Sequence, residues 1–200
     1  MTCVIVPIVE GHGEEAAVPH LIRRISGELC SRWDVEVSKP IRQPRSRLLM
    51  EATNSGPGYL EKAIRLAELK LAQRGGRGFV LVLVDADDDC PAKVVGDLLP
   101  RLGPNVSLVL PNPEFETWFA ASAEALDGLL NVDAAPETPE RDRLGKAWVR
   151  HRFARGRYSE SVDQVRLAHR IDLAFARERS PSFDKLCREV ERRLAETPPD

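Results

Sequence analysis

The chain has few cysteines, and the four it has are far apart. Cys3, Cys30, Cys90 and Cys187 form neither a Cys-x-x-Cys pair nor a cluster with histidine. This spacing excludes a zinc site built on grouped ligands, and it argues against a framework of disulfides. We therefore expect a protein of the reducing cytoplasm, where thiols stay free.

Long hydrophobic runs and a large net charge are also missing. The apolar segment 3–9 meets Glu10, is too short to span a membrane and lacks the basic flank of a signal peptide. We expect neither secretion nor membrane insertion. Twenty-nine Lys and Arg against thirty-one Asp and Glu give a formal net charge of -2. No global positive field therefore attracts nucleic acid, and any such binding needs a local patch.

Hydrophobic patterning predicts an α/β fold. Apolar runs without polar alternation are typical of parallel strands buried on both faces, and apolar residues three and four apart predict helices. The predicted strands are 3–9, 33–38, 79–84 and 106–110. The predicted helices between them are 14–29, 59–73, 91–102 and 115–126. Strands that alternate with helices indicate a mainly parallel four-stranded sheet flanked by helices.

The character of the sequence changes after residue 130. Segment 131–140 contains two prolines and no periodicity, which is typical of a linker or a long loop. No strand is evident beyond it, and the predicted helices are 162–178 and 182–196. Residues 141–200 contain fifteen Lys and Arg and ten Asp and Glu. We expect an α/β domain over 1–130 and, packed on it, a basic helical C-terminal extension over 131–200.

Acidic residues gather after three of the predicted strands. Glu10 and Glu14 follow the first, the run 85–89 with four aspartates follows the third, and Glu114 and Glu116 follow the fourth. Carboxyl ends of parallel strands meet at one edge of the sheet, so these acids converge. Carboxylates crowded together repel unless a cation compensates, and oxygen ligands without thiolates suit Mg2+ or Mn2+.

The same acids have alternative interpretations. Asp85 and Asp87 are two apart, so on an extended strand end they point to one side, which favours a metal site over a solvated acidic turn. Glu114 and Glu116 are either further metal ligands or first-turn residues that offset the dipole of the next helix.

A dinucleotide site is a further alternative. Residues 11–16 match the G-x-G-x-x-A pattern after a strand, with Glu36 as a ribose ligand. Glu10, Glu14 and Glu15 would, however, surround the pyrophosphate with negative charge. There is no G-x-x-x-x-G-K-[ST] motif, so a P-loop nucleotide hydrolase is excluded.

Two basic segments are candidate contacts to nucleic acid. Residues 141–158 carry seven Lys or Arg against one Asp, with three aromatic residues interleaved. Cations with aromatics suit a nucleic-acid backbone and its bases. The alternative, an ordinary helix with solvated arginines and buried aromatics, stays open. A smaller patch lies in a predicted loop over 39–47. The candidate contacts are Arg42, Arg45, Arg47, Lys146, Arg150, Arg152, Arg155 and Arg157.

These motifs together resemble a known domain. The chain resembles the Toprim domain of topoisomerases, DnaG-type primases and OLD-family nucleases. The resemblance rests on Glu-Gly after the first strand, another Glu four residues later, and Asp-x-Asp after a later buried strand. This match covers residues 3 to about 120. Over nearly its whole length the chain is similar to a Toprim-related family of bacterial proteins. The motifs that carry this second match are residues 9–15, 84–87, 111–119, 158–164 and 180–183.

The resemblance implies a Toprim-like, Rossmann-like fold and roles by position. Glu10 would act as general acid or base, and Asp85 and Asp87 would bind Mg2+. Further acids hold a second metal in the OLD-like nucleases, which points to Glu14 and to Glu114 or Glu116. Asp89 is a further candidate ligand within the acidic run. The implied activity is Mg2+- or Mn2+-dependent hydrolysis of a phosphodiester in DNA or RNA, with a role in bacterial defence.

Partners follow from the same resemblance. Nucleic acid is the expected partner, and an ATPase partner would have to be a separate chain, because no ATPase domain is present. A different possibility is a non-catalytic or partner-dependent component of a defence system. The sequence leaves the oligomeric state open.

Overall fold

The computed structural model describes residues 2–50, 56–154 and 156–198. At its centre is a parallel sheet of five strands in the order β2-β1-β4-β5, with β3 also paired to β1. The strands are β1 (Val4–Val9), β2 (Glu36–Val37), β3 (Ile41–Arg42), β4 (Gly78–Leu83) and β5 (Val106–Val109). The α/β class and the mainly parallel sheet are confirmed. The sheet has five strands instead of four because β2 and β3 share one edge of β1.

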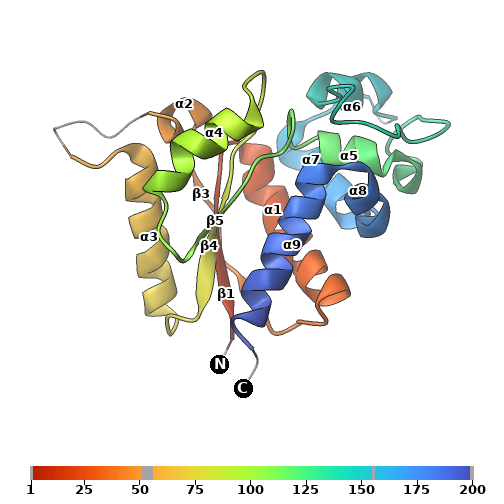
Figure 1. Ribbon diagram of the computed structural model, residues 1–200. Helices are drawn as coiled ribbons and strands as arrows, with labels where there is room; N and C mark the ends of the chain where they lie inside the picture. The colour runs from red at the N-terminus through yellow and green to blue at the C-terminus, as the bar shows by residue number, and fades with distance from the viewer. Residues whose placement is uncertain (1, 51–55, 155, 199–200) are drawn as a thin grey trace.

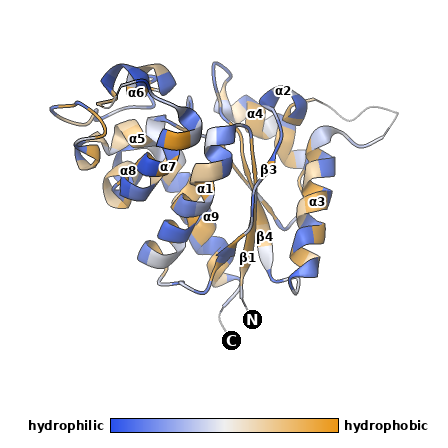
Figure 2. Ribbon diagram, turned by 180° about the vertical axis from the view of Figure 1, so that it is seen from behind, coloured by the Kyte–Doolittle hydropathy of each residue, from blue (hydrophilic) through white to orange (hydrophobic). Residues whose placement is uncertain are grey.

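Helices cover both faces of the sheet (Figure 1). One face carries α3 (Tyr59–Gln73) and α4 (Pro91–Leu98), and the other carries α1 (His12–Arg24) and α9 (Pro181–Ala195). Alternate strand residues supply the two cores, so Val6 faces α3 while Ile5 faces α1. Figure 2 shows strands that are apolar along their length and helices that are apolar on one side. Burial on both faces explains why the strands read as unbroken hydrophobic runs.

Most of the predicted helices are confirmed. The helix expected over 14–29 is α1 followed by a π-helical turn, Ile25–Leu29. The helix expected over 91–102 is α4 followed by a 3-10 turn, Leu99–Arg101. Ser180 caps α9, because its hydroxyl accepts the backbone N–H of Phe183.

Two predicted helices are divided in the structure. The segment 115–126 contains only α5 (Thr117–Ala121) and a 3-10 turn, Ala123–Leu126. The segment 162–178 is split into α7 (Glu160–Arg170) and α8 (Leu173–Arg179). The carboxylate of Asp172 accepts the backbone N–H of Phe175 at 2.9 Å, and this cap starts a new helix.

Segments without a predicted helix also fold locally. The strand expected over 33–38 is reduced to β2, and the loop expected over 39–47 contains β3 and the start of α2 (Arg45–Leu48). The basic stretch 141–158 contains α6 (Lys146–Arg152). Among the described residues, no helix is long and apolar enough to cross a bilayer.

The C-terminal helices share a core with the sheet. Leu186 and Val190 of α9 are fully buried in the same hydrophobic cluster as Ile5 and Leu81 of the strands. Helix α7 packs along α1. Gly13 permits this contact, because a Cβ at that position would lie 2.3 Å from the side-chain oxygen of Gln164. The C-terminal segment is therefore built into one of the two covering layers.

The strand order reverses beside β1. The chain passes from β1 to β2 and β3 on one side and then returns to β4 on the other. At such a reversal the loops after the two neighbouring strands part, and ligands of open α/β sheets bind there. In this chain these loops begin after Val9 and Leu83, where the sequence places its acids.

Helix α9 offers a test of this shared core. Leu186→Ala should lower the free energy of unfolding by about 2–5 kcal/mol, because it leaves a cavity under a fully buried side chain. Arg188→Ala on the outer side of the same helix should cost about 0.5 kcal/mol or less. Urea unfolding followed by tryptophan fluorescence and by circular dichroism measures both. Separate transitions in the two signals would contradict a shared core.

Candidate functional site

Glu10 and Glu14 form the turn that follows β1. Glu14, in the first turn of α1, accepts the backbone N–H of Glu10 at 3.0 Å through its Oε2 atom. It also accepts the backbone N–H of Gly11. The turn is thus folded around the carboxylate of Glu14, which is only 7% exposed.

Asp85 lies just after β4 and is tied to this turn. Its backbone N–H donates to Oε1 of Glu10 at 2.5 Å. The next residue, Ala86, donates its backbone N–H to the carbonyl of Pro111 at 2.9 Å. One hydrogen bond to the Glu10 side chain and one between backbone groups therefore hold the ends of β1, β4 and β5 side by side, as the sequence predicts.

Glu116 reaches the same region from the segment after β5. It is 1% exposed, and its Oε1 atom accepts hydrogen bonds from the hydroxyl of Tyr158 and from Nε2 of Gln164, both at 3.0 Å. Gln164 belongs to α7, and Tyr158 precedes that helix. The motif 158–164 marks both residues in the sequence, but no spacing rule connects them to Glu116.

These four carboxyl groups, Glu10, Glu14, Asp85 and Glu116, are called the acid cluster below. Burial, with repulsion from neighbouring carboxylates, raises the pKa of Glu10 to about 8 and that of Glu14 to about 7. Burial and repulsion from the other three members raise the pKa of Asp85 well above its ordinary value. Burial also raises the pKa of Glu116.

No cationic side chain contacts the acid cluster in the described parts of the chain, although the charge of Arg45 lowers the pKa of Glu10 from a distance. None of its members forms an ion pair with a Lys, Arg or His within 4.0 Å. The field of Lys146 reaches Glu14 and Glu116, but the ammonium group itself pairs with Glu160 at 3.1 Å. Buried charges without a partner are costly, so the cluster either keeps protons or takes up a cation.

The donor atoms of the acid cluster suit a hydrated divalent cation. All are carboxylate oxygens, the ligands that Mg2+ and Mn2+ prefer. The buried side-chain oxygen of Gln164 also lacks a hydrogen-bond partner among the described residues. Across that same part of the chain, however, no group of three or more His, Cys, Asp or Glu side chains is arranged to hold a metal. Mg2+ usually takes one or two carboxylates and keeps several waters, so the residues fit such an ion but form no closed cage.

Asp87 and Asp89 contact an arginine instead of the acid cluster. Arg45 of α2 lies 3.3 Å from Oδ2 of Asp87 and donates to Oδ2 of Asp89 at 2.5 Å. It also donates to the backbone carbonyls of Asp85 and Ala86. Asp87 has a φ of 50°, so the chain turns after Asp85 and the two aspartates do not continue an extended strand. Arg45, expected to contact nucleic acid, neutralises this loop.

Glu114 lies at the edge of the same region. Its Oε2 atom accepts the backbone N–H of Lys146, the first residue of α6, at 2.5 Å. Gly145 makes this approach possible, because a Cβ there would lie 2.0 Å from that oxygen. Glu114 therefore anchors α6, while Glu116 alone of this pair belongs to the acid cluster.

The two basic segments lie at the end of the molecule where the strands end, on opposite sides of the sheet (Figure 1). The structure places α2 in one of them and α6 in the other. Several of the expected contacts have partners within the chain. Those with partners are Arg42 with Glu15 (4.0 Å), Arg47 over the Tyr59 ring (5.0 Å), Lys146 and Arg150 with Glu160 (3.1 and 4.0 Å), and Arg152 over the Trp148 ring (4.4 Å). Arg157 is exposed, and Arg155 lies outside the described residues.

The glycine-rich turn does not support the dinucleotide alternative. Glu14 accepts the N–H groups of Glu10 and Gly11, which a pyrophosphate would need. Glu36 pairs in register with Val4, at the start of β1, so it lies at the opposite edge of the sheet from the turn. There it forms an ion pair with Arg74 at 3.2 Å.

The raised pKa values predict how stability depends on pH. The folded, cation-free protein keeps protons on Glu10 and Glu14 up to about pH 8 and pH 7, whereas the unfolded chain releases them near the ordinary value of 4.5. Unfolding therefore releases protons in this range, so the free energy of unfolding should fall as the pH rises from about 5 to about 9. Urea unfolding in EDTA measures this.

A matched pair of variants isolates the buried carboxylate. Glu14→Gln should flatten the pH dependence and raise the free energy of unfolding at about pH 9 by more than about 1 kcal/mol. Glu15→Gln is the control, because Glu15 is the next residue of α1 but pairs with Lys39 at 3.2 Å. Equal effects of the two substitutions would contradict the role of burial.

Comparison with known proteins gives one match. No curated protein and no solved structure matches the chain. A family model described as a domain of unknown function, DUF4276, matches residues 9–191. This range contains the whole acid cluster. It also contains the α-helices of the described residues, apart from the last residues of α9. The chain therefore belongs to the DUF4276 family.

Proposed function

We propose that this chain is a Mg2+- or Mn2+-dependent phosphodiesterase that acts on DNA or RNA. The observation that carries the proposal is the acid cluster, four carboxyl groups brought together where the strand order reverses. None of them forms an ion pair with a Lys, Arg or His of the described residues. A structural role alone would not require four acids within range of one another's charge, because their repulsion and burial weaken the fold. A bound divalent cation removes this cost.

Different residues of the acid cluster would bind the metal, transfer a proton and be held in position for such a reaction. A divalent cation held by Asp85 with Glu14 or Glu116 would activate water and offset the charge that develops on a phosphate. Glu10 is oriented by the backbone N–H of Asp85 and has a pKa of about 8, so it can accept or donate a proton near neutral pH. Tyr158 and Gln164 hold one oxygen of Glu116 and thereby orient the other.

The surface beside the acid cluster has room for a phosphate. A pocket of about 400 Å³ lies next to the segments that carry Asp85 and Glu116. It is lined by Asp87, Asp88, Glu114 and Arg143, among others, and by no member of the acid cluster itself. Arg143 is half exposed and donates to the carbonyl of Asp87 and to the carboxylate of Asp88. Its guanidinium group is suited to bind a phosphate oxygen. The basic segments at α2 and α6 on either side favour a polymer over a small phosphate ester.

The activity is tested with purified protein and three substrates, supercoiled plasmid, single-stranded DNA and RNA, in Mn2+ and in EDTA. Glu10→Gln and Asp85→Asn should each lower the rate of cleavage at least about 100-fold, because they remove the proton-transfer group and the central carboxylate. Glu15→Gln and Asp97→Asn are the controls, since both change a carboxylate that lies outside the acid cluster and outside this pocket.

Each pattern of results has a defined meaning. Cleavage that needs Mn2+ and is lost in Glu10→Gln and Asp85→Asn but kept in both controls would support the proposal. Equal cleavage by all five proteins would indicate a contaminating nuclease. A rise in melting temperature with Mn2+ that Asp85→Asn removes, without cleavage, would favour a partner-dependent component. No such rise would contradict the metal site itself.

A further inference from the structure

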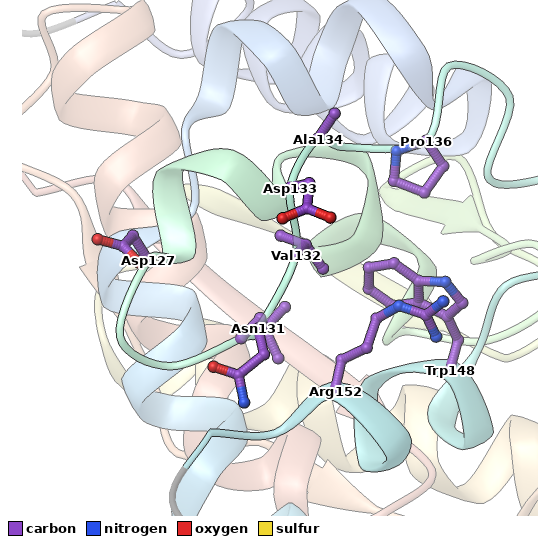
Figure 3. A pocket seen from close by; sticks show the side chains of 9 residues that line it. Asp127, Asn131, Val132, Asp133, Ala134, Pro136, Trp148 and Arg152 are labelled. Atoms are coloured by element: carbon purple, nitrogen blue, oxygen red, sulfur yellow. The ribbon is translucent and has the colours of Figure 1, made fainter.

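A second pocket lies away from the acid cluster, between α6 and the segment Asp127–Pro136 (Figure 3). Its volume of about 650 Å³ is in the range of small-molecule sites. Leu130, Val132 and Pro136 form part of its apolar lining. This pocket combines apolar walls with charged groups of both signs.

One wall of the pocket is a flat stack of two side chains. The guanidinium carbon of Arg152 lies 4.4 Å from the centre of the Trp148 ring, and Figure 3 shows the two side chains overlapping. The Arg152 side chain makes no hydrogen bond or ion pair with any other described residue. Its planar face and its N–H donors are therefore free for a ligand. Nucleobases stack on aromatic rings and on guanidinium planes alike.

The facing segment carries a polar group that could contact the edge of a ligand. Figure 3 shows Asp133 on that segment, across from Arg152, whereas the amide of Asn131 points away from the guanidinium group. The carboxylate of Asp133 has no hydrogen-bond or ion-pair partner in the described parts of the chain. Asp133 and Arg152 thus carry opposite charges in one pocket without pairing with each other. A carboxylate accepts two parallel N–H donors, which the edge of guanine offers and uracil does not.

We propose that this pocket binds a nucleotide, with its base against Arg152 and Trp148, its N–H edge at Asp133 and its phosphate at the guanidinium edge. The bound nucleotide is either a free one or one that belongs to a longer strand. Helix α6 connects the two sites, because Glu114 binds its first residue and Arg152 is its last. Seven helical residues span about 10 Å. For a strand, the proposal rests on the proposed function and places one base beside the cleavage site.

Binding is measured in EDTA, so that it does not depend on cleavage. Trp33 is 76% exposed, and Trp33→Phe removes its background fluorescence while Trp118 stays fully buried. GMP, AMP, UMP and short guanine- or uracil-containing oligonucleotides are titrated, with quenching of Trp148 as the signal. GMP should bind at least about 10-fold more tightly than UMP, a difference of about 1.4 kcal/mol. A signal from oligonucleotides but not from GMP would assign the pocket to a strand.

Four variants test the contacts. Arg152→Ala should weaken binding at least about 10-fold, and Arg152→Lys should weaken it as well, because lysine keeps the charge but lacks the flat face. Arg188→Ala is the control, since Arg188 has the same charge but lies on α9, pairs with Asp184 and does not line the pocket. Asp133→Asn should abolish the preference for GMP over UMP.

Several results would overturn the proposal. These are no quenching by any nucleotide or oligonucleotide, equal weakening by Arg188→Ala and Arg152→Ala, and an unchanged base preference in Asp133→Asn. The failure of the phosphodiesterase would look different, because wild-type protein would then not cleave in Mn2+ while the binding results in EDTA stood. Circular dichroism confirms that each variant is folded.

Discussion

Mutual repulsion within the acid cluster is the constraint that the surrounding structure has to meet. Glu10, Glu14, Asp85 and Glu116 raise one another's pKa values, or have them raised by burial, and none has an ion-pair partner in the described residues. The hydrogen bonds they do have come from neutral donors, namely backbone N–H groups, a hydroxyl and an amide. Such donors orient a carboxylate without cancelling its charge. The fold therefore leaves the charge itself for protons or a cation to compensate.

The C-terminal helices belong to this arrangement and do more than cover the sheet. Gln164 of α7 and the preceding Tyr158 hold Glu116, and the close approach of α7 to α1 depends on Gly13. At the other side of the site, Glu114 fixes the start of α6. A segment that the sequence marks as a C-terminal extension thus supplies both side-chain hydrogen bonds that orient Glu116. Packing, hydrogen bonding and the candidate chemistry depend on the same helices.

The parallel sheet, and the meeting of acidic residues at one of its edges, could be predicted from the sequence for one physical reason. Parallel strands buried on both faces are unbroken apolar runs, and their carboxyl ends meet at one edge, so Glu10 and Asp85 had to lie close together. The sequence pattern could not predict the separation of Asp87 from Asp85. That separation depends on the turn at Asp87 and on Arg45, which lies about forty residues earlier in the chain. The pairing of Glu116 with Tyr158 and Gln164 likewise depends on how distant helices pack. Local patterns locate strand ends, whereas long-range packing decides which acids share a site.

The contacts of Arg45 explain why the acid cluster stays small. By pairing with Asp87 and Asp89 and binding the carbonyls of Asp85 and Ala86, Arg45 withdraws two carboxylates from the site and holds the loop in place. If all of these acids faced one point, their repulsion would rise with each added charge. In the proposed site, a hydrated Mg2+ or Mn2+ would take one or two of the remaining carboxylates and would keep bound waters. A phosphate could then replace one of these waters, as the proposed reaction requires.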